Sequence, residues 1–177
     1  MKLFKSNIPD VKILKSNIFF DKRGFFYENY NQKKYIKLIS NVKFVQDNIS
    51  YSKKNILRGL HFQKKDPQSQ LVTLVYGKIF DVIVDLRKSS KTYKKWIGIN
   101  LDHKTKNQVY MPPGCAHGFC VISDFAIIHY KVSKLYNKKN ESGIKWNDKT
   151  LNIKWPIKKP IISKKDKSFF SLDNIFK

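Results

Sequence analysis

The sequence predicts an all-β fold, and two observations support this. The seven glycines and six prolines of the 177-residue chain fall mostly between short segments rich in Val, Ile, Phe and Tyr, a pattern typical of strands separated by turns. Apolar residues recur at helical spacing in only one segment, residues 32–39, through Tyr35, Leu38 and Ile39. Many short strands with turn signals between them indicate a β-sandwich or barrel.

Strands are expected wherever β-branched and aromatic residues cluster between turns. These segments are residues 18–20, 25–27, 44–49, 56–62, 70–75, 79–86, 96–101, 108–111, 118–121 and 126–132. Residues 70–75 and 79–86 flank a turn at Gly77, which predicts a β-hairpin. Side chains alternate along a strand, so the second arm should place Asp81, Ile83 and Asp85 on one face and Phe80, Val82, Val84 and Leu86 on the other. Among all-β folds we expect a cupin-type jelly roll with a few short helices.

Composition narrows the class of protein. Hydrophobic residues make up 41% of the chain and aromatic residues 14%, enough to bury a core, and no compositional break divides it, so we expect one domain over residues 1–177. No apolar run is long enough to span a membrane, and the first residues lack the apolar region of a signal peptide. Two cysteines, Cys115 and Cys120, suit a reduced chain better than a disulfide scaffold. These features predict a cytoplasmic protein that does not bind membranes.

The net charge of +23 arises from 36 basic and 13 acidic residues. All but three of the basic residues are lysines, scattered along the chain beside 20 isoleucines and 14 asparagines, and an A- and T-rich genome explains this bias as well as selection for binding does. No helix-turn-helix, zinc-ligand or RNP-like pattern accompanies the lysines, so we do not expect nucleic-acid binding. The charge still predicts long-range attraction to anionic ligands, weakened by salt.

Two of the three arginines, Arg23 and Arg58, precede a glycine and have aromatic residues nearby. A guanidinium offers phosphate a planar fork of N–H donors that a lysine lacks. Both residues are therefore candidates for phosphate contacts, and a structural arginine paired with a carboxylate beside a turn fits the sequence equally well.

Two histidines are candidates for chemistry. His61 falls on the strand expected at residues 56–62, and His117 follows the turn-forming residues 111–114. Metal-binding cupins have a similar turn, but their other motif needs His-x-His with a nearby Glu, and no Glu occurs between His61 and Glu141. One or two histidines without a carboxylate do not complete a metal shell, so we expect no metal.

Several blocks of sequence form a recognisable pattern. They are residues 19–28 (FFDKRGFFYE), 44–50 (FVQDNIS), 57–63 (LRGLHFQ), 77–82 (GKIFDV), 85–90 (DLRKSS), 112–119 (PPGCAHGF), 146–148 (WND) and 155–156 (WP). In order and spacing these blocks resemble the dTDP-4-dehydrorhamnose 3,5-epimerase family of sugar-nucleotide epimerases, and the resemblance extends from about residue 8 to residue 166. Without the resemblance, we would expect Tyr130 and Tyr136 to pack in the core and Asp166 to be a solvated charge. The resemblance outweighs these expectations.

The resemblance implies a metal-free, cofactor-independent cupin that forms a homodimer by exchanging N-terminal strands and binds a nucleotide sugar partly through the neighbouring subunit. It implies that His61 is the base that removes a proton next to a C4 ketone, that Asp166 orients and charges it, and that Tyr130 is the acid on the opposite face. The implied substrate contacts are Arg58, Gln46 and Asn48 for pyrophosphate and sugar, Arg23 and Glu28 across the dimer, and His117 and Tyr136 in the pocket.

These roles suit the reaction, because C3 and C5 of a 4-keto sugar both lie next to the carbonyl, so deprotonation gives an enolate without a cofactor. A histidine, which titrates near neutrality, is a suitable base. One departure concerns Gln70, since the family usually has Lys in a Gln-x-Lys-Leu-Val stretch and this chain has Gln68-Ser69-Gln70-Leu71-Val72. A neutral donor stabilises an enolate less than a charged one. Epimerisation at a single centre, or a related 4-keto hexose or heptose substrate, therefore stays open beside 3,5-epimerisation. Two further alternatives also stay open. One is a 3,4-ketoisomerase, and the other is a non-catalytic basic cupin that binds an anionic glycan or nucleic acid.

Overall fold

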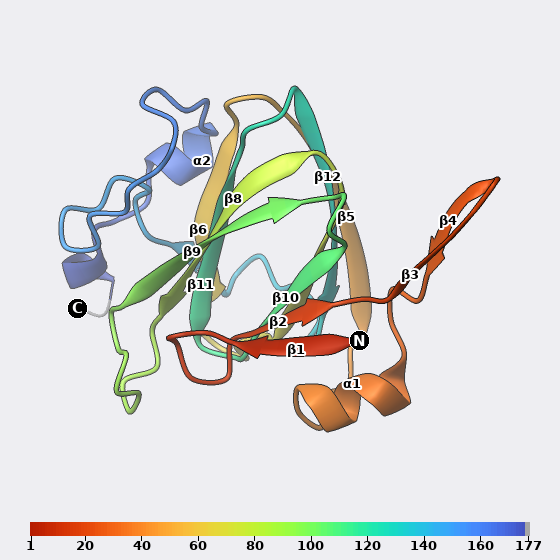
Figure 1. Ribbon diagram of the computed structural model, residues 1–177. Helices are drawn as coiled ribbons and strands as arrows, with labels where there is room; N and C mark the ends of the chain where they lie inside the picture. Colours follow the sequence, from red (N-terminus) through yellow and green to blue (C-terminus); the bar gives the residue numbers. More distant parts are fainter. Residues whose placement is uncertain (176–177) are drawn as a thin grey trace.

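A computed structural model describes residues 1–175 and contains two antiparallel β-sheets that face each other (Figure 1). The six-stranded sheet has the order β1 (Lys2–Lys5), β2 (Lys12–Lys15), β10 (Asn107–Met111), β7 (Gln70–Tyr76), β12 (Phe125–Val132) and β5 (Gln46–Lys53). The five-stranded sheet has the order β13 (Glu141–Gly143), β6 (Leu57–Gln63), β11 (Cys115–Val121), β8 (Lys78–Asp85) and β9 (Trp96–Asp102). The all-β jelly roll expected from the sequence is confirmed.

The remaining elements are short. A separate two-stranded hairpin joins β3 (Ile18–Asp21) to β4 (Gly24–Tyr27). The helices are α1 (Gln32–Leu38), α2 (Lys164–Lys167) and the 3₁₀ turn η1 (Leu172–Asn174). Within residues 1–175 the longest helix, α1, has seven residues, and no helix is long and apolar enough to cross a membrane.

Every segment expected to be a strand contains one, with shifted ends. β5 begins at Gln46 rather than at residue 44, and β11 begins at Cys115 rather than at residue 118. The sequence did not predict β1, β2 or β13. All residues of β1 are exposed and β13 has only three residues, so neither carries the buried alternation from which strands are inferred.

The predicted hairpin between residues 70–75 and 79–86 is wrong. β7 pairs with β10 and β12 in one sheet, whereas β8 pairs with β11 and β9 in the other. The chain changes sheets at Gly77, whose φ of +94° favours glycine and where a Cβ would lie 2.3 Å from the Phe125 carbonyl oxygen. Both strands are largely buried, and each is central because it pairs on both sides.

The predicted alternation along β8 is confirmed by the two cores that the strand separates. Ile79 and Ile83 pack in the cluster between the two sheets. Val82 and Val84 pack on the other face, in a second cluster with Leu151 of the C-terminal segment. That segment covers the outer side of the five-stranded sheet (Figure 1). β8 therefore carries polar residues of its inner face, such as Asp81, into the space between the sheets.

Helix α1 forms where apolar spacing predicted it. The side chain of Asn31 accepts a hydrogen bond from the Lys34 N–H and caps the N-terminus. Tyr35 and Ile39 are buried in a third cluster with residues of β2, β7 and β10, so the helix closes the outer face of the six-stranded sheet.

The β3–β4 hairpin projects away from the two sheets (Figure 1). Its phenylalanines are largely exposed, with 62% of Phe19, 74% of Phe20, 54% of Phe25 and 72% of Phe26 accessible. Such a concentration of exposed aromatic surface is typical of an interaction site.

Candidate active site

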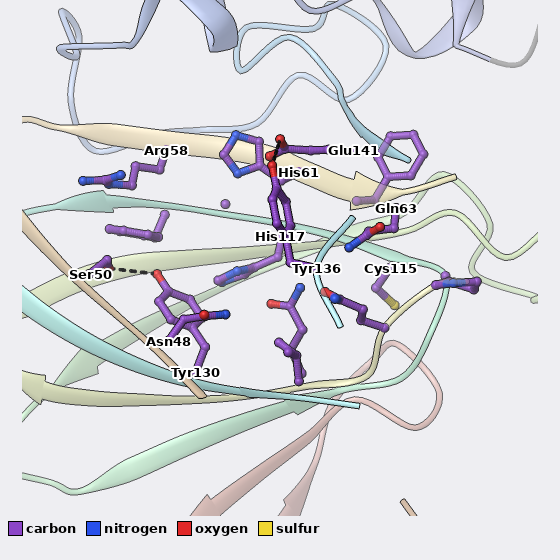
Figure 2. Close-up of a pocket in the computed structure, with 18 of the residues that line it drawn as sticks. Asn48, Ser50, Arg58, His61, Gln63, Cys115, His117, Tyr130, Tyr136 and Glu141 are labelled. Atoms are coloured by element: carbon purple, nitrogen blue, oxygen red, sulfur yellow. Dashed lines mark hydrogen bonds between the residues drawn. The ribbon is translucent and has the colours of Figure 1, made fainter. Parts of the chain in front are cut away.

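A cavity of about 340 Å³ lies between the two sheets and is lined by β5, β7 and β12 from one and β6 and β11 from the other (Figure 2). Seven of the eleven residues singled out in the sequence line it: Asn48, Arg58, His61, Gln70, His117, Tyr130 and Tyr136. Asp166 and Gln46 contact these residues from outside the cavity. Arg23 and Glu28 lie elsewhere.

An irregularity in the pairing of β6 with β11 brings Arg58 and His61 to the same cavity. His61 lies opposite His117, and Arg58 lies opposite Phe119. Two residues of β6 therefore lie between these pairs, where β11 has only one. Without this bulge, residues three apart would point to opposite faces. Gly59 permits it, because its φ is +125° and a Cβ there would lie 2.5 Å from the Cα of Gly118.

His61 forms a histidine–carboxylate pair with Asp166. The Nε2 of His61 lies 2.9 Å from Oδ1 of Asp166, and the Gly59 N–H donates to Oδ2 at 3.1 Å. Only 3% of the Asp166 side chain is exposed. Burial opposes the charged carboxylate, but the hydrogen bonds from His61 and Gly59 outweigh it and hold the pKa of Asp166 below its usual value. With the Nε2 hydrogen held by the carboxylate, Nδ1 has the lone pair of a base.

Asp166 reaches the site because of helix α2. Ser163 caps this helix by accepting a hydrogen bond from the Asp166 N–H at 3.0 Å. The single turn of helix directs the carboxylate inward, although three of its four residues are lysines.

Tyr130 approaches the cavity from the opposite sheet. Its Oη lies 3.2 Å from Ser50 Oγ, and its ring packs edge-on against His117 with centroids 6.2 Å apart. Burial raises the pKa of Tyr130 above its ordinary value, and Asp81 adds to this, while Ser50 and Arg58 act in the opposite direction. The phenol is therefore protonated at neutral pH and can act as a proton donor.

His117 has a carboxylate partner that sequence reasoning did not assign to the site. Its Nε2 lies 2.6 Å from Oδ1 of Asp81, and 7% of the His117 side chain and 0% of the Asp81 side chain are exposed. The alternation along β8 could have identified Asp81, because a carboxylate on the inner face of a buried strand requires a partner.

The inward face of β5 is a row of polar residues at alternate positions. Gln46 accepts a hydrogen bond from the Tyr136 N–H at 2.9 Å and donates to Asn48 at 2.8 Å. Ser50 contacts Tyr130, and Ser52 accepts a hydrogen bond from the Nε of Arg58 at 2.9 Å. Sequence reasoning missed Ser50 and Ser52, although the period of two that they share with Gln46 and Asn48 was a usable signal.

The cavity lining contains a charged group that was also missed. Glu141 accepts hydrogen bonds from Tyr136 Oη at 2.7 Å and from Lys165 Nζ at 2.8 Å, and all three residues line the cavity. Burial opposes the charge of Glu141, but Lys165 and Tyr136 keep its pKa below the usual value. Tyr136 and Glu141 are five positions apart, but Lys165 follows Glu141 by 24 positions, so no local pattern could join all three.

Arg23 and Glu28 are not near the cavity of their own chain. Arg23 lies on the projecting hairpin, with 84% of its side chain exposed, and pairs with Asp21 at 2.6 Å. Glu28 follows the hairpin and pairs with Lys34 at 2.9 Å.

The cavity has no evident metal-ligand set. Among residues 1–175, no group of three or more His, Cys, Asp or Glu side chains is arranged to hold a metal ion. Cys115 lines the cavity, and burial raises the pKa of its thiol to about 12, which leaves it a poor nucleophile. The groups that line the cavity include a histidine base, His61, on one wall, a phenol acid, Tyr130, on the other, and the guanidinium of Arg58.

Comparison with known proteins identifies relatives of this architecture. A family model described as dTDP-4-dehydrorhamnose 3,5-epimerase matches residues 5–174. The dTDP-4-dehydrorhamnose 3,5-epimerase of Shigella flexneri is 49% identical over 168 residues, which cover 94% of this chain and 93% of the relative. A dTDP-4-dehydrorhamnose 3-epimerase of Streptomyces niveus is 39% identical over 148 residues, covering 82% and 72%.

A solved structure has the same fold. The dTDP-6-deoxy-D-glucose-3,5-epimerase of Legionella pneumophila, in complex with dTDP-4-keto-L-rhamnose, superposes with a TM-score of 0.96 at 39% identity, covering 98% of this chain and 94% of that one.

Proposed function

Because this chain belongs to the dTDP-4-dehydrorhamnose 3,5-epimerase family, we propose that it epimerises a dTDP-linked 4-keto-6-deoxy sugar, dTDP-4-dehydro-6-deoxyglucose, without a cofactor. The observation that supports this best is the placement of His61 and Tyr130, which face one cavity from opposite sheets. Inversion at carbon requires a base on one face and an acid on the other.

The reaction begins at a carbon next to the C4 ketone. The Nδ1 of His61 takes the proton, and the C–H electron pair forms an enolate whose charge resides on the ketone oxygen. Tyr130 then gives its phenolic proton to the opposite face of the same carbon. The enolate collapses to the ketone with inverted configuration, leaving His61 protonated and Tyr130 as a phenolate. Each of the two groups is expected to contribute about 10² to 10⁴-fold.

The other residues in and beside the cavity bind and orient the substrate. Arg58 is positioned by Ser52 and by the Tyr51 carbonyl oxygen, and its guanidinium suits a pyrophosphate. Gln46, Asn48 and Gln70 contact the sugar and phosphates, and His117 and Tyr136 complete the pocket. The net charge of +23 favours the approach of the dianionic substrate.

The complete site forms in a homodimer in which N-terminal strands are exchanged. The exposed phenylalanines of the β3–β4 hairpin are the surface that a second copy would cover, and Arg23 and Glu28 would then contact the nucleotide in the neighbouring cavity. In this proposal residues 1–177 act as one domain, and the enzyme works in the cytoplasm, in surface polysaccharide synthesis.

Inversion at a single centre is the second candidate, because Gln70 occupies a cavity position where its neutral amide adds no charge to the enolate. The Streptomyces niveus relative described as a 3-epimerase supports this alternative. Both candidates are tested by incubating the protein with dTDP-4-dehydro-6-deoxyglucose in D₂O and recording proton NMR spectra. Exchange and inversion at C3 and C5 support 3,5-epimerisation, inversion at one carbon supports the alternative, and migration of the ketone or no exchange at all contradicts both.

A further inference from the structure

Ser50 is placed to act on Tyr130 and on no other proposed proton-transfer group. It lies on the inward row of β5, two residues from Asn48, which pairs with Tyr130 across the β5–β12 ladder. Its Oγ is 3.2 Å from Tyr130 Oη, and it lines the cavity (Figure 2).

The reaction determines which of the two hydroxyls donates. Tyr130 must direct its own hydrogen at the substrate carbon, so only a lone pair of Oη remains for Ser50, and the Ser50 hydroxyl must be the donor. In this direction the hydrogen bond becomes charge-assisted as the phenolate forms, and charge-assisted hydrogen bonds are roughly twice as strong as neutral ones. An interaction that strengthens in the transition state raises the rate rather than the affinity.

The groups around Tyr130 differ in how they affect the phenolate that forms when it gives up its proton. Asp81 of β8 disfavours the phenolate, Arg58 of β6 favours it, and the ring of His117 on β11 packs against the phenol. Ser50 is the neutral donor in direct contact with the oxygen that becomes charged.

We propose that Ser50 is a positioning residue that donates a hydrogen bond to Tyr130 Oη, aims the phenolic hydrogen at the substrate and stabilises the phenolate left by proton transfer. The O–H bond of Tyr130 breaks and a C–H bond forms with the enolate electron pair, while Ser50 keeps its own proton. The role rests on the epimerase function proposed above.

Substituting Ser50→Ala should separate the two halves of the reaction. The rate of inversion in D₂O should fall about tenfold or more, as expected for a lost hydrogen bond to a charged group, while exchange of the α-proton with retention, which needs His61, continues. The KM should change less than twofold. Ser50→Thr keeps the hydroxyl and should restore inversion, and Ser50→Cys, a weak donor of similar shape, should fall between the two.

The ratio of exchange to inversion is a readout that a merely structural role would not change, because only proton transfer by Tyr130 uses the hydrogen bond from Ser50. Ser52→Ala is the matched control on the same strand face. Because Ser52 holds Arg58, it should raise KM and leave the ratio of exchange to inversion unchanged.

A Ser50→Ala enzyme with the wild-type ratio of exchange to inversion, or a Ser50→Thr enzyme that inverts no faster than Ser50→Ala, would overturn the role of Ser50. That outcome is distinct from failure of the proposed function, in which the wild-type protein would show neither exchange nor inversion.

Discussion

His61 and His117 lie directly opposite each other across β6 and β11, yet each directs its Nε2 to a different carboxylate, Asp166 for His61 and Asp81 for His117. The carboxylates come from different parts of the chain. Asp81 belongs to β8 of the same sheet, whereas Asp166 belongs to helix α2 of the C-terminal segment. The two imidazoles are thereby oriented independently within one cavity.

The proposed dimer predicts complementation between two defective subunits. Arg23→Ala removes a contact to the neighbour's nucleotide, and His61→Ala removes the base of its own cavity. In a hybrid dimer one cavity then carries both defects and the other carries neither. Co-expression should therefore recover roughly a quarter of wild-type activity, measured below KM, if subunits associate statistically. Co-expressed His61→Ala and Asp166→Asn should recover nothing extra, because every cavity retains one defect. Equal activities in the two mixtures would exclude contacts across the dimer.

Affinity for the nucleotide sugar should depend on Arg58 and hardly on surface lysines. Arg58→Met removes a guanidinium at the cavity, and loss of its charge-assisted hydrogen bonds should weaken binding by about tenfold or more in calorimetric titration. Lys149→Met removes the same charge at an exposed position outside the cavity and should change the Kd less than twofold at about 0.15 M salt, where the Debye length is about 8 Å. Equal losses in both variants would indicate that net charge, not the cavity, binds the substrate.

Replacing Gln70 by lysine should raise the rate of α-proton exchange. The amide of Gln70 brings no charge to the enolate, and an ammonium would add charge assistance on the order of 1 kcal/mol, or about fivefold. The gain should be larger at whichever carbon the native enzyme handles poorly, and NMR in D₂O resolves the two carbons. If Gln70→Lys slows exchange at both, Gln70 is a specificity contact to a different sugar.

Asp85 should be a major contributor to stability. Its buried carboxylate accepts hydrogen bonds from Arg87 at 2.8 Å, Ser90 at 2.6 Å and Thr92 at 2.7 Å. Burial opposes the charge, but these three partners hold the pKa of Asp85 well below its ordinary 3.8. Asp85→Asn should lower the free energy of unfolding by about 3 kcal/mol, as for other broken buried pairs.

The pH dependence of that difference follows from the lowered pKa. Asp85 contributes fully above the ordinary carboxyl value, and its contribution is lost as pH falls toward the folded-state pKa. The gap between wild type and Asp85→Asn in urea unfolding should therefore be constant from pH 7 to about pH 5 and shrink below about pH 4. Asp124→Asn, at a surface pair with Lys54 whose carboxylate is 90% exposed, should cost less than about 1 kcal/mol. Similar losses in both variants would contradict the role of Asp85.

Local patterns predicted most of the strands and the faces of β8, because alternation within a segment records which side is buried. They did not reveal strand partners. β7 and β8 follow each other through Gly77 as a hairpin would, yet pairing depends on strands from elsewhere in the chain. The bulge at Gly59, which turns Arg58 and His61 to one cavity, likewise depends on the close approach of Gly118.

The residues of the candidate site likewise include some that the sequence could identify and some that it could not. His61, His117 and Tyr130 could be singled out from motifs and family resemblance, and Asp81 could have been found from its place on the inner face of a strand. Glu141 and Lys165 could not be found, because their hydrogen bond joins residues 24 positions apart, in a segment whose many lysines suggest a solvated surface.

The central claim, that His61 and Tyr130 act on opposite faces of one carbon, is tested most directly by proton NMR of dTDP-4-dehydro-6-deoxyglucose in D₂O. We expect His61→Ala to abolish solvent exchange at the α-carbons, and Asp166→Asn to reduce it strongly with substrate binding largely kept. Tyr130→Phe should exchange the α-proton but fail to invert the centre. Near-normal exchange by His61→Ala, or inversion by Tyr130→Phe at the wild-type rate, would contradict the claim, and the first result would make His117 the next candidate for the base.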